Sequence, residues 1–263
     1  MRRVVVKLGG HALDSLRPTA PVLVDLAHDI TELKSRGIDV ALVHGGGPQI
    51  ADLLDTAGLA SRFVNGLRIT DTVTMMYVAM ALQHVNLLIT AALSHNGVSS
   101  VGIGGGDGSL FTSVSLGEPW LRAGTTPTVR TELVSALWAS GFSPVISPLA
   151  IDAEGELLNC NADTSAGALA GALDADLLVL LSDIDQLRAD VDDPSTALAR
   201  VSVADVEKLV ETGAIKEGMR PKVAAALDAL HAGAARIVIA NGKRPHALRD
   251  ALESHIPTTE VVR

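Results

Sequence analysis

The sequence predicts an α/β protein, a three-layer αβα sandwich with a mainly parallel, open central sheet. Three observations support this fold class. Short apolar, β-prone runs alternate along the chain with longer segments of helical apolar spacing. Two of these runs lead into glycines, as strands that end at a ligand site of an open sheet commonly do. The 263 residues, of which 48% are hydrophobic, suffice for one large domain with a sizeable core.

The expected strands of the central sheet are unbroken apolar runs, which is typical of strands buried on both faces. They cover residues 3–8, 38–43, 98–103, 143–146, 177–181, 237–240 and 259–262. Two other segments predict hairpins, because turn residues separate their β-prone pieces: 63–70 around Asn65-Gly66, and 151–158. The stretch 109–130, rich in Gly, Pro and Thr, is expected to form short surface hairpins.

Helices are expected where apolar residues recur every three or four positions. These segments are 21–36, 49–57, 73–94, 131–140, 164–173, 203–211, 221–232 and 245–252. Gly37 is a candidate C-cap of the first helix, and Asp71 is a candidate N-cap of the long third helix. That third helix is apolar around much of its circumference, so at least two of its faces should be covered.

Composition and charge narrow the possible functions. The formal net charge of −9 argues against nucleic acid as a partner, and an anionic substrate would have to be held by local cations and amides. No apolar run reaches the ~18 residues of a membrane span, so no membrane partner is expected. Met1-Arg2-Arg3 leads straight into a predicted strand, so no signal peptide is expected. The single cysteine, Cys160, excludes an internal disulfide and favours a cytoplasmic protein; we expect this thiol to be packed and unreactive.

The stretch from Val40 to Ile50 contains a buried strand, His44, the glycines Gly45, Gly46 and Gly47, and Pro48 at the start of a helix. Such a turn leaves backbone N–H groups facing one point, which suits a phosphate or carboxylate. Its spacing matches neither a Walker loop nor the dinucleotide fingerprint, so a dehydrogenase is not indicated. A simple tight turn remains the alternative. We expect His44 to orient the backbone, since the eight histidines lack zinc-ligand spacing and no metal site is predicted.

The first strand carries Lys7 and runs into Gly9-Gly10. A first strand is usually central in an open sheet, so Lys7 should lie beside two sets of bare amides, unless it is merely a solvated strand end. Other clusters at predicted strand ends are Asn159, Asn161 and Asp163, and Asp183 with the segment 216–222. Two lysines, an aspartate and two amide nests suit phosphoryl transfer, which depends on positioning and charge neutralisation.

With these motifs in order, the chain resembles the amino acid kinase family. The matching pieces are Val5-Val-Lys7-Leu-Gly9-Gly10, Val43-His-Gly-Gly-Gly-Pro-Gln49, Val64-Asn-Gly-Leu-Arg68-Ile-Thr-Asp71, Asn159-Cys-Asn-Ala-Asp163 and Gly218-Met-Arg-Pro-Lys222. Lys-x-Gly-Gly and Asn-Ala-Asp are shared across the family, whereas Asn-Gly-Leu-Arg-x-Thr is similar to its acetylglutamate branch. The chain departs from the family pattern at Leu87, Gly104 and Ile184-Asp185-Gln186.

The resemblance implies one amino acid kinase domain over residues 1–263. An N-terminal lobe of about 1–158 would hold an acyl-amino-acid, and a C-terminal lobe of about 159–263 would hold ATP. Lys7 and Lys222 would stabilise the transferring phosphoryl group, and Asp163 would orient both lysines. The substrate would be bound by Gly45, Gly46, Arg68, Asn159 and Asn161. The nucleotide would be bordered by Gly9, Gly10, Ser182, Asp183, Asp185, Leu187, Lys216, Gly218 and Met219, with magnesium held mainly by its phosphates.

The implied reaction is ATP-dependent phosphorylation of the side-chain carboxylate of N-acetyl-L-glutamate, on the way to ornithine and arginine. A carboxylate with a pKa of about 4.3 is already ionised at neutral pH and needs no general base. One alternative is a kinase for carrier-linked or N-acetylated aminoadipate or glutamate, which the intact Asn-Gly-Leu-Arg motif disfavours. Another is a non-catalytic nucleotide or amino-acid sensor, which the presence of Lys7, Asp163 and Lys222 disfavours.

The resemblance also implies an oligomeric state. Arginine-inhibited members carry an additional N-terminal helix that links dimers into hexamers, and three residues before Val4 are too few for one helical turn. We therefore expect a homodimer that arginine does not inhibit strongly. Its contact is expected on the long helix, around Met75, Met76, Val78, Ala79 and Leu82. The alternative is that this helix is covered entirely within its own subunit.

Overall fold

The computed structural model of the protein describes residues 2–9, 13, 15–190, 192–211, 223, 226–227, 230–231, 234 and 236–262. The helix expected at 221–232 falls largely outside this part of the chain, as do five of the predicted site residues: Gly10, Lys216, Gly218, Met219 and Lys222.

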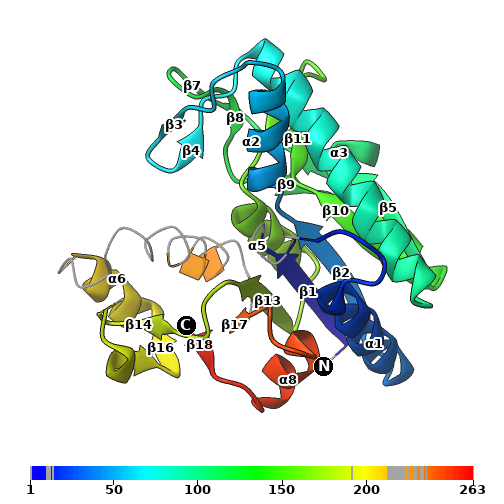
Figure 1. Ribbon diagram of the computed structural model, residues 1–263, viewed down its shortest axis with the longest axis vertical. Helices are drawn as coiled ribbons and strands as arrows, with labels where there is room; N and C mark the ends of the chain where they lie inside the picture. The colour runs from blue at the N-terminus through cyan, green and yellow to red at the C-terminus, as the bar shows by residue number, and fades with distance from the viewer. Residues whose placement is uncertain are drawn as a thin grey trace.

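An eight-stranded sheet forms the centre of the molecule (Figure 1). Its strands, in the order in which they lie side by side, are β16 (Arg200–Ser202), β18 (Thr258–Val262), β17 (Ile237–Asn241), β13 (Leu177–Ser182), β1 (Arg3–Leu8), β2 (Asp39–His44), β10 (Ser143–Ser147) and β5 (Ser100–Gly104). Neighbouring strands are parallel except β17 and β18. The first strand lies inside the sheet, between β13 and β2, as predicted.

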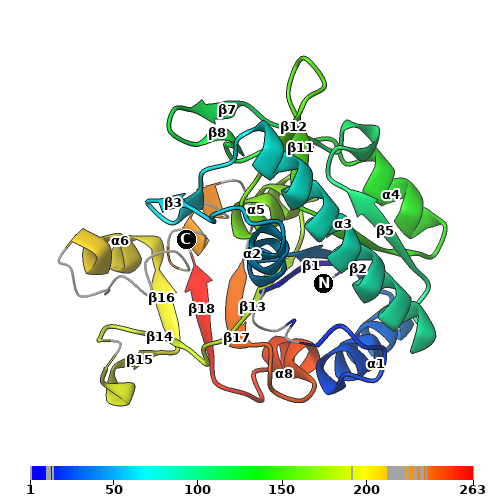
Figure 2. The same cartoon turned by 45° about the horizontal axis from the view of Figure 1, so that its top comes forward.

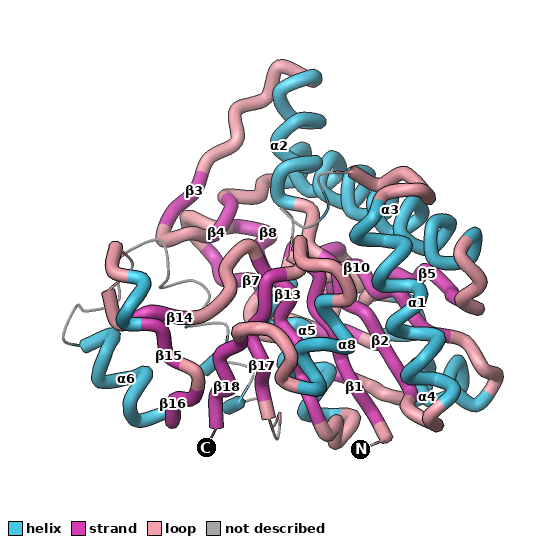
Figure 3. Tube along the Cα trace, turned by 60° about the horizontal axis from the view of Figure 1, so that its bottom comes forward, coloured by secondary structure: helices cyan, strands magenta, loops and turns pink. Residues whose placement is uncertain are grey.

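Alternating residues of β1 belong to two separate cores, because successive side chains point to opposite faces of a sheet. Val4, Val6 and Leu8 pack with α1 (Pro21–Ser35), α3 (Thr72–His95) and α8 (Ala247–Glu253) (Figure 3). Val5 packs in the other core with α4 (Glu132–Ala139), α5 (Ala162–Ala172) and α6 (Val203–Glu211). These two cores and the sheet between them are the three layers of the predicted sandwich.

A smaller sheet of six strands adjoins the carboxyl end of β10. Its order is β7 (Ser115–Gly117), β8 (Leu121–Gly124), β12 (Leu157–Asn159), β11 (Leu149–Ile151), β6 (Phe111–Thr112) and β9 (Thr128–Val129). The hairpins expected at 109–130 and 151–158 are therefore confirmed. Strand β12 brings Asn159 to the start of α5.

The Asn65-Gly66 hairpin is confirmed as β3 (Phe63–Val64) and β4 (Leu67–Arg68). Asn65 and Gly66 have φ values of 51° and 78°, the left-handed pair that a tight type I′ turn requires. The indole of Trp120 donates to the carbonyl oxygen of Val64 at 3.1 Å, which ties the hairpin to the β7–β8 region. Figure 1 shows the hairpin beside those strands.

The long helix α3 begins at its predicted cap, because the Asp71 carboxylate accepts from the Thr74 N–H at 2.7 Å. By length and composition it is the one described helix that could cross a membrane, a test that a helix packed in a protein core also passes. One side of it packs on the sheet and on α2 (Gly47–Thr56), which lies beside it in Figure 2. Met75, Val78 and Leu82, which were expected in a dimer contact, are buried there, whereas Met76 is 53% exposed.

Two elements of the carboxyl half were not predicted. Strands β14 (Leu187–Arg188) and β15 (Ala197–Leu198) form a small hairpin, and β16 extends the central sheet at its edge. The Leu187 N–H donates to the Thr259 hydroxyl at 2.8 Å, so β14 is tied to β18. Two- and three-residue strands carry too little periodic pattern to be recognised in a sequence.

Candidate active site

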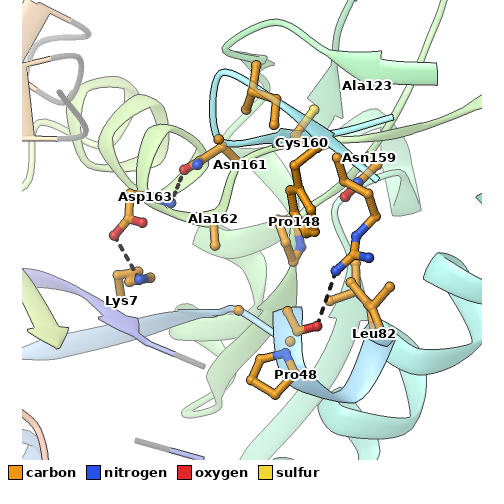
Figure 4. Close-up of a pocket in the computed structure, with 18 residues that line it drawn as sticks. Lys7, Pro48, Leu82, Ala123, Pro148, Asn159, Cys160, Asn161, Ala162 and Asp163 are labelled. Carbon is orange, nitrogen blue, oxygen red and sulfur yellow. Dashed lines mark hydrogen bonds and ion pairs between the residues drawn. The ribbon is translucent and has the colours of Figure 1, made fainter. Parts of the chain in front are cut away.

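A pocket of about 280 Å³ opens where β1, β2, the β3–β4 hairpin and the start of α5 meet (Figure 4). It is lined by Lys7, Gly45, Gly46, Gly47, Pro48, Ile50, Phe63, Gly66, Leu67, Arg68, Leu82, Ala123, Pro148, Asn159, Cys160, Asn161, Ala162 and Asp163. The fold thus brings together every residue that was predicted to bind the acceptor substrate, and two of the three predicted catalytic residues.

Lys7 and Asp163 form an ion pair at one side of this pocket, with 2.8 Å between Nζ and Oδ1. Lys7 has the same parity as Val5, so it points to the face of the sheet that α5 covers. Asn161 is the N-cap of α5, since its side-chain oxygen accepts from the N–H groups of Asp163 and Thr164 at 2.8 and 3.2 Å. Asp163 therefore does not serve as the cap. Its carboxylate extends from the first turn toward Lys7 (Figure 4).

The two glycine turns were predicted to leave their backbone N–H groups bare, and for two of these groups the prediction is wrong. The Gly45 N–H donates to Leu8 O, and the Gly9 N–H donates to Leu181 O, both at 2.9 Å. These two amides extend the strand ladders by one residue and are not bare. No hydrogen bond between described residues uses the N–H of Gly46 or Gly47, the N-cap and first residue of α2. The amides that remain for an anion thus begin at Gly46, at the positive end of the α2 dipole.

His44 orients the backbone, as predicted. Its side chain is fully buried, its Nδ1 lies 2.8 Å from Gly45 O, and its Nε2 lies 3.2 Å from Asn86 Nδ2. Burial lowers the pKa of the imidazole to about 4, so the ring is neutral at physiological pH. A neutral, fully buried ring has no access to a proton of the substrate, so the role of His44 is structural.

Arg68 is a buried cation at the other side of the pocket. Its side chain is 7% exposed, and its guanidinium donates to the Ser61 hydroxyl and to Gly47 O, the latter at 3.2 Å. The guanidinium carbon also lies 4.6 Å from the centre of the Phe63 ring. Burial lowers the pKa of Arg68, and no acidic residue of the described chain forms an ion pair with it. A buried guanidinium without a carboxylate is a natural site for the carboxylate of a ligand.

Asn159 and Cys160 line the wall between the two cations. The Asn159 amide donates to the buried Thr70 hydroxyl at 3.3 Å, which fixes one side of the amide group. Cys160 is 4% exposed, and its thiol lies 3.6 Å from Thr125 O. Burial raises the pKa of Cys160 to about 11, which agrees with the predicted packed, unreactive thiol.

The described residues predicted to border the nucleotide lie at the neighbouring strand end, outside this pocket. The Ser182 hydroxyl donates to Asp183 at 3.1 Å. Asp185 accepts from Arg244 Nε at 2.7 Å and from Asn241 Nδ2 at 3.1 Å, and the Arg244 hydrogen bond is the main cause of its lowered pKa. Asp185, which precedes the position where the family pattern has glycine (Gln186 here), therefore links the loops that follow β13 and β17.

Sequence reasoning missed Asn86, Asn241 and Arg244 as contributors to this region. A signal existed for Asn86, which is a polar residue four positions from the inward-facing Leu82 on a mostly apolar helix. The glycine at position 104, where the chain departs from the family pattern, also follows from packing on this helix. A Cβ at Gly104 would lie 2.7 Å from the Gln83 side-chain nitrogen. No local pattern marks Asn241 or Arg244, which meet Asp185 only through the fold.

Comparisons with known proteins agree with this geometry. The family model described as "Amino acid kinase family" matches residues 2–241. An acetylglutamate kinase of Methanococcoides burtonii is 37% identical, covering 93% of this chain and 84% of the relative. One of Methanopyrus kandleri is 39% identical, covering 90% and 94%. A crystal structure of a protein from Streptococcus mutans is similar with a TM-score of 0.80 and 26% identity, covering 91% of this chain and 94% of that chain. The chain described here belongs to the amino acid kinase family.

Proposed function

We propose that the protein is an ATP-dependent kinase that phosphorylates the side-chain carboxylate of N-acetyl-L-glutamate in arginine biosynthesis. One observation carries the proposal: a single pocket has Lys7 at one side and, at the other, Arg68 buried without an acidic partner among the described residues. Two cations in one pocket suit a ligand with two carboxylates. The curated acetylglutamate kinases at 37% and 39% identity support the choice of acceptor.

In this proposal the Arg68 fork holds the α-carboxylate, and Asn159 with Asn161 faces the acetamido group. Gly46 and Gly45 border the acceptor from the turn. The side-chain carboxylate, already ionised, forms a new bond from its oxygen to the γ-phosphorus of ATP while the bond to the ADP oxygen breaks. No proton is transferred. Lys7, held by Asp163, offsets the negative charge where the two anions meet.

The nucleotide is proposed to lie along the end of β13, beside Gly9, Ser182, Asp183, Asp185 and Leu187. Gly10, Lys216, Gly218, Met219 and the catalytic Lys222 complete that side by sequence resemblance alone. Residues 1–158 would then hold the acceptor and residues 159–263 the nucleotide. No group of three or more metal-ligating side chains occurs in the described part of the chain, and Asp163 is paired with Lys7. Both facts fit magnesium held mainly by the phosphates of ATP.

The assay that tests the acceptor couples ADP release to a spectroscopic signal and compares N-acetylglutamate, glutamate, aspartate and N-acetylaminoadipate. We expect kcat/KM for N-acetylglutamate to exceed kcat/KM for the other three compounds by at least roughly tenfold. Only N-acetylglutamate is expected to match both cations and the side-chain amides of Asn159 and Asn161. Preference for N-acetylaminoadipate would favour the related-carboxylate kinase. Ligand binding without turnover would instead favour a sensor.

A homodimer built on α3 is the proposed assembly, and the reducing cytoplasm is the proposed location. An apolar stripe runs along the outer side of this helix: Val73, Met76, Met80 and Leu87 are each more than half exposed, at 53, 53, 54 and 65%. Their spacing of three, four and seven residues places them on one face. Sedimentation should give a dimer for the wild type and a monomer for Met76→Asp/Met80→Asp. Val114→Asp, at an apolar position outside α3 that is 69% exposed, is the control and should stay dimeric.

A further inference from the structure

Helix α3 supports the glycine turn with two side chains one turn apart. A Cβ at Gly46 would lie only 2.8 Å from Leu82 Cδ2, so the turn packs directly on the helix. Asn86, four positions further along, is 3% exposed and faces the strands of the sheet. Because residues at i and i+4 share one face of a helix, both contacts come from the same side of α3.

The two N–H groups of the Asn86 amide lie within hydrogen-bond distance of acceptors on three strands. Its Nδ2 lies 2.8 Å from Val145 O, 3.3 Å from Ile103 O and 3.2 Å from His44 Nε2. Since carbonyl oxygens only accept, the NH₂ side must face them, and His44 Nε2 must be the acceptor nitrogen of the ring. On the opposite side, a Cβ at Gly102 would lie 2.1 Å from Asn86 Oδ1. Only glycine at this position leaves room for the amide.

The His44 ring is thereby held in one tautomer. Its Nδ1 lies 2.8 Å from Gly45 O, which can only accept, so Nδ1 carries the proton. The low pKa that burial gives His44 keeps the ring neutral and this arrangement intact.

Gly45 is consequently fixed at both of its polar groups, through Leu8 O at its N–H and through His44 at its carbonyl. The carbonyl of Gly45 and the N–H of Gly46 belong to one planar trans peptide group and point in opposite directions. With the carbonyl directed toward His44, the Gly46 N–H is directed away from the buried ring. Gly46 lines the pocket, and its N–H has no hydrogen-bond partner among the described residues.

We propose that Asn86 is a positioning residue for acceptor binding: by holding the His44 ring it orients the Gly45 carbonyl, and with it the Gly46 N–H that meets the substrate. The last link rests on the proposed function, whereas the connection Asn86–His44–Gly45 is independent of it. The connection also explains why a buried polar residue occupies the inner face of a mostly apolar helix.

Steady-state kinetics test the functional link. Asn86→Leu removes the donor while keeping a side chain of similar volume, and we expect the KM for N-acetylglutamate to rise at least roughly tenfold with the KM for ATP within twofold. Thr90→Val is the matched control: its hydroxyl bonds Asn86 O within the helix and also faces Gly102, but does not contact His44. It should leave both constants within twofold. An unchanged acceptor KM in a folded Asn86→Leu enzyme would overturn the proposal.

Long-range ¹H–¹⁵N correlation spectra of ¹⁵N-histidine-labelled protein test the connection without any substrate, so a wrong acceptor assignment cannot affect the result. The His44 signals, assigned with the His44→Gln variant, should show a protonated Nδ1 and an unprotonated Nε2. In Asn86→Leu both tautomers should become populated. If that variant does not fold, the wild-type spectrum still decides, since a His44 protonated at Nε2 would contradict the proposed hydrogen bonds.

Discussion

Lys7 Nζ and Asp163 Oδ1 lie 2.8 Å apart, which joins the end of a central strand to the first turn of α5. The two side chains are 12% and 23% exposed, so water reaches the pair only in part. A carboxylate in the first turn is favoured by the helix dipole, and it anchors an ammonium that keeps further N–H groups for a ligand. The pair therefore sets where positive charge is presented to the pocket.

Lys7→Met should lower turnover at least ~10²-fold with little effect on the fold, because a preorganised charge acts mainly on the transition state. Methionine keeps most of the apolar stem and removes the ammonium. The coupled assay measures turnover, and circular dichroism melting reports the fold. Lys34→Met is the control, since Lys34 is a half-buried lysine of α1 whose ammonium donates to Gly141 O. Near-normal turnover in a folded Lys7→Met enzyme would remove the proposed role of Lys7.

Arg68→Lys should raise the KM for the acceptor at least roughly tenfold and leave the KM for ATP nearly unchanged. A lysine ammonium cannot reproduce the planar two-pronged contact with a carboxylate, nor the contact with the Phe63 ring. The control is Arg62→Lys, which replaces an exposed arginine of the same hairpin region. In this variant the KM for the acceptor and the KM for ATP should both stay unchanged. A change confined to the KM for ATP would assign Arg68 to the wrong substrate.

Stability should fall as pH decreases from about 6.5 toward 4 because of His44. The folded-state pKa is about 4 against an ordinary 6.5, so in this window the unfolded chain binds a proton that the native protein does not. The contribution is complete above pH 6.5 and is lost progressively below it, on the order of 3 kcal/mol in total. Urea unfolding of wild type and His44→Gln at several pH values measures the difference. Parallel pH profiles for the two proteins would contradict the assignment.

Cys160 should react slowly with iodoacetamide in the native protein. A thiol with a pKa of about 11 is ionised to roughly one part in a thousand at pH 8, and the side chain is 4% exposed. Mass spectrometry of timed samples at pH 8 should show labelling at least roughly tenfold slower than in urea-unfolded protein. Equal rates in the two states would mean that the thiol is accessible in the pocket wall.

The sequence by itself determined most elements of the sheet, the helices around it and the members of the acceptor pocket. Buried strands, amphipathic helices and the Asn65-Gly66 turn are encoded in local periodicity and turn chemistry. Glycines and cations that follow parallel strands must gather at one edge of the sheet, so Lys7 and Gly46 could be placed together in advance. The Lys7–Asp163 pair was expected only from the family resemblance, and the burial of Arg68 could not be foreseen from local pattern.

Only the tertiary structure decided which polar groups are already occupied. The Gly45 N–H extends a strand ladder, Asn161 caps α5, and Arg68 is buried without an acidic partner in the described chain. Asn86 reaches His44 from a position 42 residues away in sequence. Hydrogen-bond partners follow from strand register and from which helix covers which face, and these are properties of distant segments brought together. Local patterns record the groups that can bond, whereas the packed fold determines which of them do.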